Sequence, residues 1–369
     1  MALQLFDLDL RIDQVDYLAK INLEFTPGAF NVLLGRTLAG KTSLMRVIAG
    51  LEQPSNGKVM LHGKDITALP VQKRNVSMVY QQFINYPHMT VWENIASPLK
   101  LNRVKPDEIK RRVEQTAELL QISPYLQRLP LELSGGQQQR CAMARALVKD
   151  AQIILFDEPL VNLDYKLRES LRIELKQITQ QRDSIVIYST TEAHEALALG
   201  GQTTLLHEGK VLQSGPALEQ FHYPVDLNAA DLYHEPPLNR LAVGKALVCA
   251  EHINLSGLAG DKLLANGDSI IAVRPDQVSL HPLDKESMQI EADIDLAEIS
   301  ASETYLHVSF DYREFGRLNW VLHLNGIHTF SNQKKLSLFV PISKLFVFDP
   351  QGKALRVPSQ VNHDIEGVV

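Results

Sequence analysis

One segment of the chain restricts its fold more than any other. Residues 35–42 read Gly-Arg-Thr-Leu-Ala-Gly-Lys-Thr and match the pattern G-x-x-x-x-G-K-[ST]. An apolar run at 30–34 precedes the segment, and Leu44, Val47 and Ile48 follow it at helical spacing. A glycine-containing turn with a chance lysine is the alternative interpretation, and both flanks argue against it. We predict a phosphate-binding loop in a layered α/β core.

The rest of the first half of the chain fits such a core. Residues 106–121 carry apolar side chains down one side of a helix, and residues 167–178 repeat this period. A short β-prone run follows at 184–188. Because strands alternate with helices, we expect the strands to pair in parallel.

The predicted loop carries the groups that phosphate binding needs. Its glycines let backbone N–H groups turn towards phosphate oxygens, and the helix N-terminus adds partial positive charge. Lys41 can reach the outer phosphates, and the hydroxyl of Thr42 can bind Mg²⁺. We expect contacts to the nucleotide from Gly35, Arg36, Thr37, Leu38, Ala39, Gly40, Lys41, Thr42 and Ser43.

A second segment ends an apolar strand with two carboxylates. Residues 153–158 read Ile-Ile-Leu-Phe-Asp-Glu. At the carboxyl edge of a strand, Asp157 can hold Mg²⁺ through water, and Glu158 can polarise an attacking water. Two acids after a strand are common by chance, but much less so in an α/β chain that also has a phosphate loop.

A third segment, residues 133–137, reads Leu-Ser-Gly-Gly-Gln and opens a helix that continues to residue 147. A serine hydroxyl and glycine N–H groups at a helix N-terminus form a second anion-binding end. An ordinary helix cap would explain Ser134 alone, but hardly the whole segment. We expect this end to contact nucleotide through Ser134, Gly135, Gly136 and Gln137.

In this order, the three segments resemble those of the ATP-binding subunits of ABC transporters, and the resemblance extends over nearly the whole chain. It implies ATP and Mg²⁺ as ligands and two subunits that meet head to tail, with each ATP between one phosphate loop and the other signature segment, residues 133–137. Gln81 matches the glutamine that contacts Mg²⁺ and the transmembrane partner. Asp164, in the loop 162–164, matches a residue that crosses to the opposite subunit.

The phosphate loop departs from the family pattern at residues 36–38. Family members usually carry Pro-Ser-Gly there, whereas this chain has Arg-Thr-Leu. Leu38 adds a Cβ and bulk where glycine allows close approach of the backbone, so we expect altered geometry around the nucleotide. The adenine-stacking aromatic is also displaced, since its position falls near Ile12 and the nearest aromatic is Tyr17.

A further departure lies in residues 188–196. The family's switch histidine aligns with Thr191, and His194 follows three residues later. A threonine hydroxyl can donate a hydrogen bond to the γ-phosphate or to water, but it lacks the proton chemistry of imidazole. By the resemblance, the catalytic residues are Glu158, Thr191 and Gln81, and His194 remains an alternative to Thr191.

These departures concern the site that the chain builds with its own phosphate loop, whereas its signature segment is complete. We therefore hypothesise an asymmetric pair. The chain's own site would hydrolyse ATP weakly, and its signature segment would complete a competent site on a different ATPase subunit. A homodimer is the other arrangement.

The pattern of the sequence changes after about residue 224, where short β-prone runs replace helical periods. We expect a nucleotide-binding domain at 1–235, with a helical subdomain at about 84–150, and an all-β domain at 236–369. The second domain resembles the C-terminal regulatory domain of importers such as the maltose transporter ATPase, an oligonucleotide-fold-like domain of the TOBE type. The resemblance rests on residues 237–239, 271–276 and 345–350.

Composition limits the partners. With 37 basic and 43 acidic residues among 369, the net charge is −6, which argues against a broad nucleic-acid surface. Cys141 and Cys249 fall in no metal-binding or disulfide pattern, so a reducing compartment fits. We find neither a signal peptide nor an apolar run of about 18 residues. We expect a peripheral protein on the cytoplasmic face of the inner membrane.

The resemblance points to importers of carbohydrates, polyols, glycerol or glycerol phosphate. Residues 83–94 resemble the segment that leads into the helical subdomain of carbohydrate importers and offer a groove for a permease helix. The expected partners are transmembrane permease subunits, a second ATPase subunit and, indirectly, a solute-binding protein. A non-transport ABC ATPase and a nucleotide-binding regulatory subunit with little hydrolysis are the alternatives.

Overall fold

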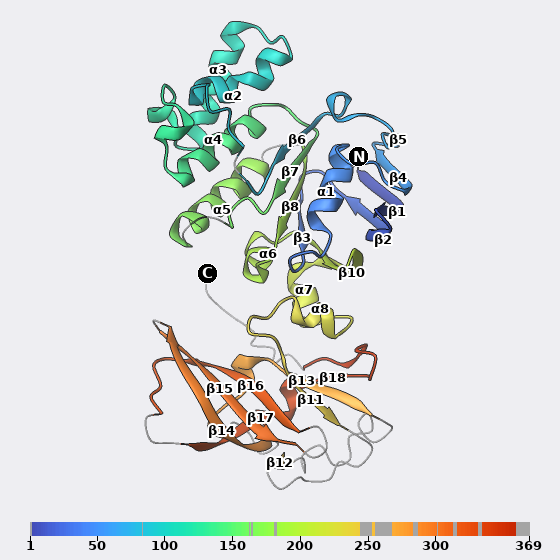
Figure 1. The fold of residues 1–369 in the computed structure, drawn as a ribbon, viewed down its shortest axis with the longest axis vertical. Coiled ribbons are helices and arrows are strands. Elements are labelled where there is room, and N and C mark those ends of the chain that lie inside the picture. Colours follow the sequence, from blue (N-terminus) through green and yellow to red (C-terminus); the bar gives the residue numbers. More distant parts are fainter. Residues whose placement is uncertain are drawn as a thin grey trace, which may run out of the picture. The chain divides into compact units, whose positions relative to one another are not determined.

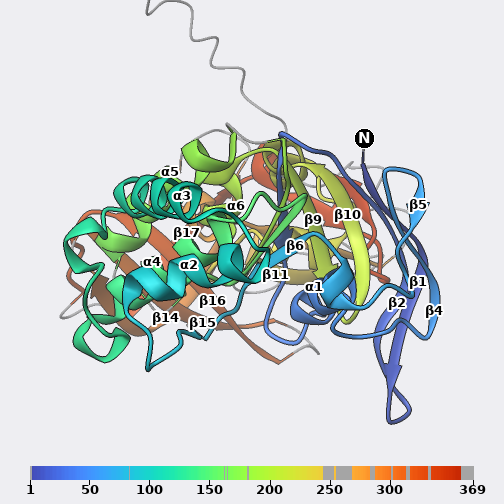
Figure 2. The ribbon, with the colours of Figure 1, turned by 90° about the horizontal axis from the view of Figure 1, so that it is seen from above.

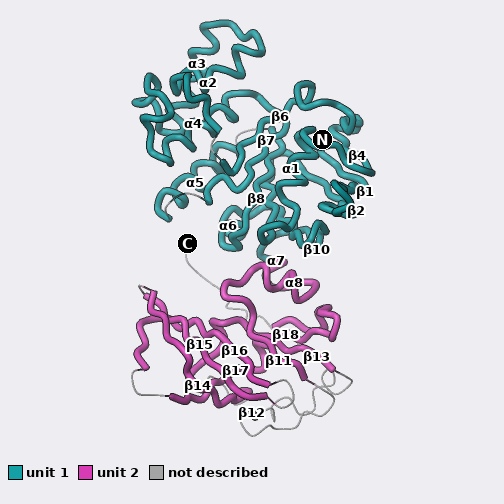
Figure 3. Tube along the Cα trace, viewed as in Figure 1, with its two compact units in different colours: residues 1–218 teal, residues 219–369 magenta. Residues whose placement is uncertain are grey.

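The computed structural model of the chain (Figure 1) describes residues 2–82, 84–161, 163, 165–180, 183–243, 253–254, 268–282, 287–300, 302–312, 316–330 and 334–358. The chain divides into two compact units, Met1–Leu218 and Glu219–Val369 (Figure 3). In the described part of the chain, no helix is both long enough and apolar enough to cross a membrane.

A six-stranded sheet forms the centre of the first unit, in the order β10-β9-β3-β8-β7-β6. The pairs from β9 to β6 run parallel, and β10 joins β9 in antiparallel fashion. Every residue of β3, β7 and β8 is buried, which explains their continuous apolar runs. The predicted parallel α/β core is confirmed. The strands are β3 (Phe30–Leu34), β6 (Val76–Val79), β7 (Ile153–Asp157), β8 (Ile185–Thr190), β9 (Gln202–His207) and β10 (Lys210–Pro216).

A second, antiparallel sheet lies on the other side of α1 (Lys41–Ala49). Its order is β2-β1-β4-β5. Leu44 and Val47 of α1 share one apolar core with Leu5 of this sheet and Leu155 of the central sheet. The helix that follows the phosphate loop is therefore fixed from both sides. The strands are β1 (Leu3–Ile12), β2 (Val15–Phe25), β4 (Asn56–Leu61) and β5 (Lys64–Asp65).

Three helices gather away from α1, as Figures 1 and 2 both show. They are α2 (Val91–Leu101), α3 (Pro106–Leu119) and α4 (Gly135–Leu147). α5 (Tyr165–Gln180) and α6 (Ala193–Leu199) follow β7 and β8. The expected helices at 106–121 and 167–178 are thus confirmed, while the limits of a helical subdomain at about 84–150 stay a prediction. Single 3₁₀ turns occupy Val71–Lys73, Ser123–Tyr125 and Pro130–Glu132.

The second unit is built mainly from two antiparallel sheets. One has the order β11-β13-β18-β19, and the other has the order β12-β14-β15-β16, with β17 paired to β14. Apolar side chains from both sheets form one core, which confirms the predicted all-β region. The strands are β11 (Asn239–Val243), β12 (Ile253–Asn254), β13 (Ser269–Val273), β14 (Ser287–Ser300), β15 (Glu303–Asp311), β16 (Arg317–Asn325), β17 (Lys335–Pro341), β18 (Phe346–Phe348) and β19 (Ala354–Arg356). Pro275–Gln277 and Ile342–Lys344 are 3₁₀ turns.

The division between the units precedes the boundary that we expected at residues 235 and 236. The helix α7 (Ala217–His222) spans the division, and α8 (Leu227–Asp231) lies after it. Leu227 and Ala230 of α8 pack in one apolar cluster with Phe346 and Phe348 of β18. The stretch 219–235, which we expected in the first domain, thus includes a helix whose buried contacts are with the second unit's sheet.

Gly201, at the start of β9, offers a test of how tightly the phosphate-loop strand is held. Its φ is 81°, and a Cβ there would overlap the Phe30 carbonyl oxygen at the start of β3. Gly28 has a similar φ of 73°, but a Cβ would meet no atom within 4 Å. We expect Gly28→Ala to lower the free energy of unfolding by about 1 kcal/mol, from backbone strain alone. Gly201→Ala should cost clearly more.

Chemical denaturation of both variants measures the difference. Equal losses in the free energy of unfolding would show that the overlap of an added Cβ at residue 201 with β3 costs nothing beyond backbone strain.

Candidate nucleotide site

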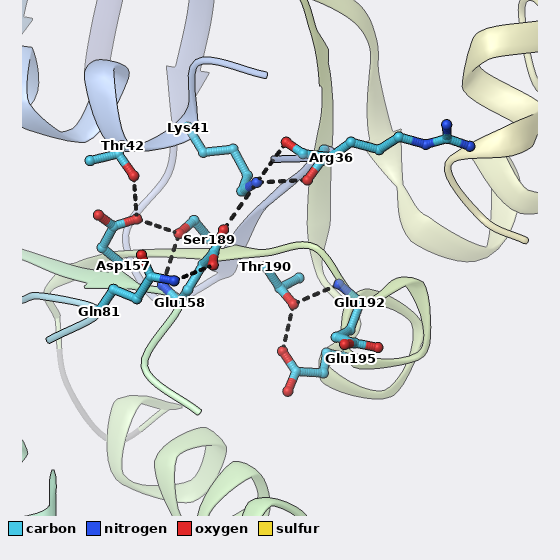
Figure 4. Close-up of polar contacts among 11 residues, drawn as sticks. Arg36, Lys41, Thr42, Gln81, Asp157, Glu158, Ser189, Thr190, Glu192 and Glu195 are labelled. Carbon is cyan, nitrogen blue, oxygen red and sulfur yellow. Dashed lines mark hydrogen bonds and ion pairs between the residues drawn. The ribbon is translucent and has the colours of Figure 1, made fainter. Parts of the chain in front are cut away.

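The phosphate loop lies between β3 and α1, at the carboxyl edge of the central sheet (Figure 4). The Gly35 N–H donates to the Thr190 carbonyl at 3.3 Å, so the loop begins against the end of β8. Gly35 must be glycine, because a Cβ would stand 2.5 Å from the Leu206 carbonyl oxygen. Gly40 has a φ of 101° and precedes the first residue of α1. The backbone therefore has the strand, turn and helix that the sequence predicted.

Lys41 turns its ammonium group into this loop. Its side chain is 4% exposed, and Nζ donates to the carbonyl oxygens of Gly35 at 2.6 Å and Arg36 at 3.0 Å. Nζ also forms an ion pair with Oε1 of Glu158 at 3.1 Å. An ammonium group has three N–H donors, so the loop and Glu158 occupy all of them. A phosphate that binds here must replace some of these partners.

Asp157 is buried at the end of β7, with 3% of its surface exposed. Its Oδ1 accepts hydrogen bonds from Ser189 Oγ at 2.8 Å and Thr42 Oγ1 at 3.1 Å. Burial raises the pKa of this carboxyl above its usual range, although both hydrogen bonds oppose the shift. A carboxylate beside a hydroxyl provides the oxygen ligands that Mg²⁺ prefers, so this pair fits the ion.

Glu158 follows with a φ of 44°, an uncommon conformation for a residue with a side chain. Its N–H donates to Ser189 Oγ at 3.0 Å, and its Oε2 accepts from Gln81 Nε2 at 3.1 Å. Glu158 thus joins Lys41 and Gln81 across the site. The structure brings together Lys41, Thr42, Gln81, Asp157 and Glu158, as expected from the sequence.

Sequence reasoning missed Ser189 as a site residue. In the β7–β8 ladder Ser189 lies directly opposite Asp157, and its hydroxyl bonds both to that carboxylate and to the Glu158 N–H. A small polar residue near the carboxyl end of an apolar strand was the available signal. Its meaning depends on the pairing of strands far apart in the sequence.

The signature segment begins α4. Ser134 Oγ accepts from the Gln137 N–H at 3.4 Å, and Gln137 Oε1 accepts from the Ser134 N–H at 3.1 Å. This capping box leaves open space beside Gly135. Among the described residues, no hydrogen bond or ion pair joins residues 134–137 to the phosphate loop, and α4 lies apart from α1 in Figures 1 and 2. The two predicted anion-binding ends therefore lie apart within the chain.

An ion pair connects the signature helix to the helix after the acidic strand. Arg140 of α4 lies 3.0 Å from Oε2 of Glu174 in α5, and both side chains are largely buried. Arg140 also donates to the Leu120 carbonyl at 2.8 Å. The other carboxylate oxygen of Glu174 accepts from Gln121 and Ser170. Glu174 thus contacts residues on both sides of the interface between α4 and α5.

The residues that depart from the family pattern lie around the same site. Leu38 is 94% exposed and has a φ of 68°, so the leucine keeps a conformation suited to glycine. Tyr17 is 43% exposed, and its carbonyl oxygen would lie 3.1 Å from a Cβ on Gly40, so Tyr17 adjoins the loop. Ile12 instead pairs with Val15 in the β1–β2 hairpin.

Thr191 follows β8 and lines a small pocket of about 10 Å³ together with Glu158. His194 is half-exposed and directs Nδ1 towards Glu192 at 3.6 Å. Thr191 is therefore the better placed of the two to act beside Glu158. Asp164, with Asn162, lies outside the described residues.

Comparison with known proteins decides the family. The family model described as "ABC transporter" matches residues 18–161. An sn-glycerol-3-phosphate import ATP-binding protein, UgpC 3 of Rhizobium etli, is 34% identical over 347 residues, which cover 94% of this chain and 97% of the relative. This chain belongs to the ABC transporter ATP-binding proteins.

Another relative matches the chain over a similar extent. A maltose/maltodextrin import ATP-binding protein, MalK of Yersinia pestis, is 33% identical over 345 residues, or 91% of this chain and 92% of the relative. A solved dimeric structure, a post-hydrolysis state of the ATP-binding cassette MJ0796 bound to ADP and Pi, covers 58% of this chain and 98% of its own. It has a TM-score of 0.54 and 26% identity. The expected ABC ATPase fold and class are confirmed.

The buried carboxylate of Asp157 leads to a prediction about stability. The pKa of Asp157 is higher in the folded chain than in the unfolded chain, so ionisation of Asp157 opposes folding. This free-energy cost is absent at pH values below the unfolded pKa and complete at pH values above the folded pKa. We expect Asp157→Asn to raise Tm of the nucleotide-free chain at neutral pH, and the gain should shrink as pH falls through the raised pKa.

Thermal unfolding at several pH values checks this, with the exposed Asp107 as control: Asp107→Asn should change Tm little. A lower Tm for Asp157→Asn at neutral pH would contradict the argument.

Leu38 leads to a second prediction. A left-handed conformation costs an ordinary residue about 1 kcal/mol or more, and the exposed side chain of Leu38 loses little burial when removed. Leu38→Gly should therefore stabilise the chain, although the greater unfolded-state freedom of glycine offsets part of the gain. Leu38→Ala keeps the Cβ and should bring no gain. Urea denaturation of both variants tests this, and equal stabilities would refute backbone strain at residue 38.

Proposed function

We propose that this chain is the ATP-binding subunit of an importer. ATP would bind at the phosphate loop, residues 35–43, and against the signature segment of a second ATPase chain. The observation that carries the proposal is the group of Lys41, Asp157 and Glu158 at one edge of the central sheet. An ion pair joins Lys41 to Glu158, and the Ser189 hydroxyl bonds to both the Asp157 carboxylate and the Glu158 N–H. The capped signature segment on the same chain supports a head-to-tail dimer.

Thr42, Gln81 and Asp157 would hold Mg²⁺. Thr42 Oγ1 and Asp157 Oδ1 already lie 3.1 Å apart, and Gln81 bonds to Glu158 through its nitrogen, which leaves its amide oxygen for the ion. When bound, Mg²⁺ would neutralise charge on the β- and γ-phosphates. Burial of Asp157 disfavours its ionised form, and a nearby cation would favour that form.

Hydrolysis would begin with an exchange of partners. As phosphate oxygens replace the Gly35 and Arg36 carbonyls around Lys41, its ammonium group would turn to the phosphates and release Glu158. The freed carboxylate would orient the attacking water and accept its proton. Thr191, across the small pocket from Glu158, would donate a hydrogen bond to that water or to the γ-phosphate. Tyr17 would stack on adenine.

The transported solute would be a small carbohydrate, a polyol, glycerol or glycerol phosphate. The relatives are named for import of sn-glycerol-3-phosphate and of maltose or maltodextrin. Import requires membrane partners, so we propose permease subunits that contact residues 83–94, and a peripheral location on the cytoplasmic face of the inner membrane. The second domain, at 236–369, would regulate or dimerise the subunit.

The pair of ATPases would be asymmetric. Three positions around the chain's own phosphate loop depart from the family, at Leu38, Thr191 and Tyr17, while Ser134 and its neighbours keep the family sequence. This chain would therefore hydrolyse ATP weakly at its own loop. Its signature segment would complete the more active site on a distinct partner ATPase.

Measured ATPase activity of the chain alone and paired with that partner tests the asymmetry. We expect weak activity alone, and Thr191→His should raise it by restoring an imidazole. In the pair, Glu158→Gln in this chain should leave most activity, because the active site uses the partner's acidic strand. Ser134→Glu in this chain should abolish activity, because it adds negative charge where ATP phosphates bind.

The asymmetric proposal fails if the lone chain is fully active. It also fails if Glu158→Gln abolishes activity of the pair while Thr191→His adds nothing. If neither Glu158→Gln nor Ser134→Glu in this chain changes the activity of the pair, the result would favour a regulatory subunit with little hydrolysis.

A further inference from the structure

A buried carboxylate lies just behind the site, at Glu195 in α6. It is 3% exposed, and its Oε2 accepts hydrogen bonds from Thr190 Oγ1 at 2.7 Å and from the Tyr188 hydroxyl at 3.0 Å. Among the described residues, no Lys, Arg or His lies within ion-pair distance of it. Its partners are therefore the two hydroxyls at the end of β8, and it lies in the first turn of α6, where a carboxylate is favourable.

Thr190 links this carboxylate to the turn that contains Thr191. Its hydroxyl donates to Glu195 and accepts from the Glu192 N–H at 3.0 Å, so the side chain closes a turn around Thr191 (Figure 4). The Thr190 carbonyl accepts from the Gly35 N–H. Hydrogen bonds therefore hold both neighbours of Thr191, Thr190 and Glu192, and Thr190 bonds directly to the phosphate loop.

The turn forms one wall of the small pocket beside Glu158. The pocket, of about 10 Å³, is lined by Glu158, Leu160, Val161, Thr190, Thr191, Glu192 and Glu195. This volume is close to the smallest that holds one water molecule, roughly 10–15 Å³. A shift of the turn by a fraction of an ångström would therefore change the distance between Thr191 and Glu158 and the room for a water between them.

We propose that Glu195 is a positioning residue for ATP hydrolysis, which holds Thr191 against the pocket beside Glu158 through the hydroxyl of Thr190. This inference rests on the proposed function of the site. The role depends on hydrogen bonds that Glu195 accepts. A glutamine keeps one carbonyl oxygen as acceptor and should therefore preserve the role of Glu195. A residue without an acceptor should lose that role.

Single-turnover hydrolysis by this chain without the partner ATPase, and its binding of a fluorescent ATP analogue, separate positioning from binding. Glu195→Ala should slow hydrolysis about tenfold or more, as small displacements of reacting groups do, while Kd for the analogue stays the same. Thr190→Val should reproduce this loss. Glu195→Gln should restore the rate with an unchanged pH profile. Tyr188→Phe is the matched control: it removes the other bond to Glu195 and should leave hydrolysis unchanged.

Hydrogen exchange supplies a readout that does not depend on hydrolysis. Loss of the Glu195 acceptor should free Thr190, so the Glu192 amide should exchange faster in Glu195→Ala and not in Glu195→Gln or Tyr188→Phe. Thermal unfolding identifies any variant that fails to fold.

Two results overturn the proposal. One is a loss of hydrolysis in Glu195→Gln as large as in Glu195→Ala, which would assign the role to the charge. The other is unchanged exchange at Glu192 in Glu195→Ala. Absence of ATP binding by the unsubstituted chain would instead refute the proposed function, and the exchange experiment would still test Glu195.

Discussion

The buried ammonium group of Lys41 needs hydrogen-bond and ion-pair partners, and the conformation of the phosphate loop depends on them. Two loop carbonyls and the Glu158 carboxylate surround its Nζ. The contact with Glu158 ties the start of α1 to the end of β7, so one cation joins two chain segments far apart in the sequence. The same contact places an anionic oxygen beside the Lys41 ammonium group. Phosphate binding, as we propose it, would therefore exchange one charged partner of Lys41 for another.

The parallel sheet explains why these residues meet at one edge. β3, β7 and β8 end side by side, so the residues that follow each strand project into the same space. Each strand contributes a different chemical group: the loop amides and Lys41 after β3, two carboxylates at the end of β7, and hydroxyls at the end of β8. Ser189 bonds to both the Asp157 carboxylate and the Glu158 backbone, which keeps the two acids in fixed relation.

The sequence predicted the parts of the site that depend on local order. A glycine pattern between a strand and a helix, two acids after an apolar run, and a serine before two glycines each have a meaning within a few residues. It did not predict contacts set by strand pairing, such as Ser189 opposite Asp157, or by the buried side of a helix, such as Glu195 beneath Thr190. The bulk of Leu38 was evident from the sequence, but only the backbone dihedral showed that the loop keeps a glycine conformation there. The second unit begins early for the same reason, since α8 owes its place to Phe346 and Phe348, more than a hundred residues later.

The ion pair between Arg140 and Glu174 joins two helices with different tasks. α4 carries the signature segment, which would serve the nucleotide of the neighbouring chain, and α5 follows the chain's own acidic strand. Because the pair is largely buried, loss of either partner would leave a charge without compensation. Exchange of α4 for another helix would therefore destabilise the chain unless the new helix keeps this arginine. The choice of residue at the signature helix is in this way linked to the helix that follows the acidic strand.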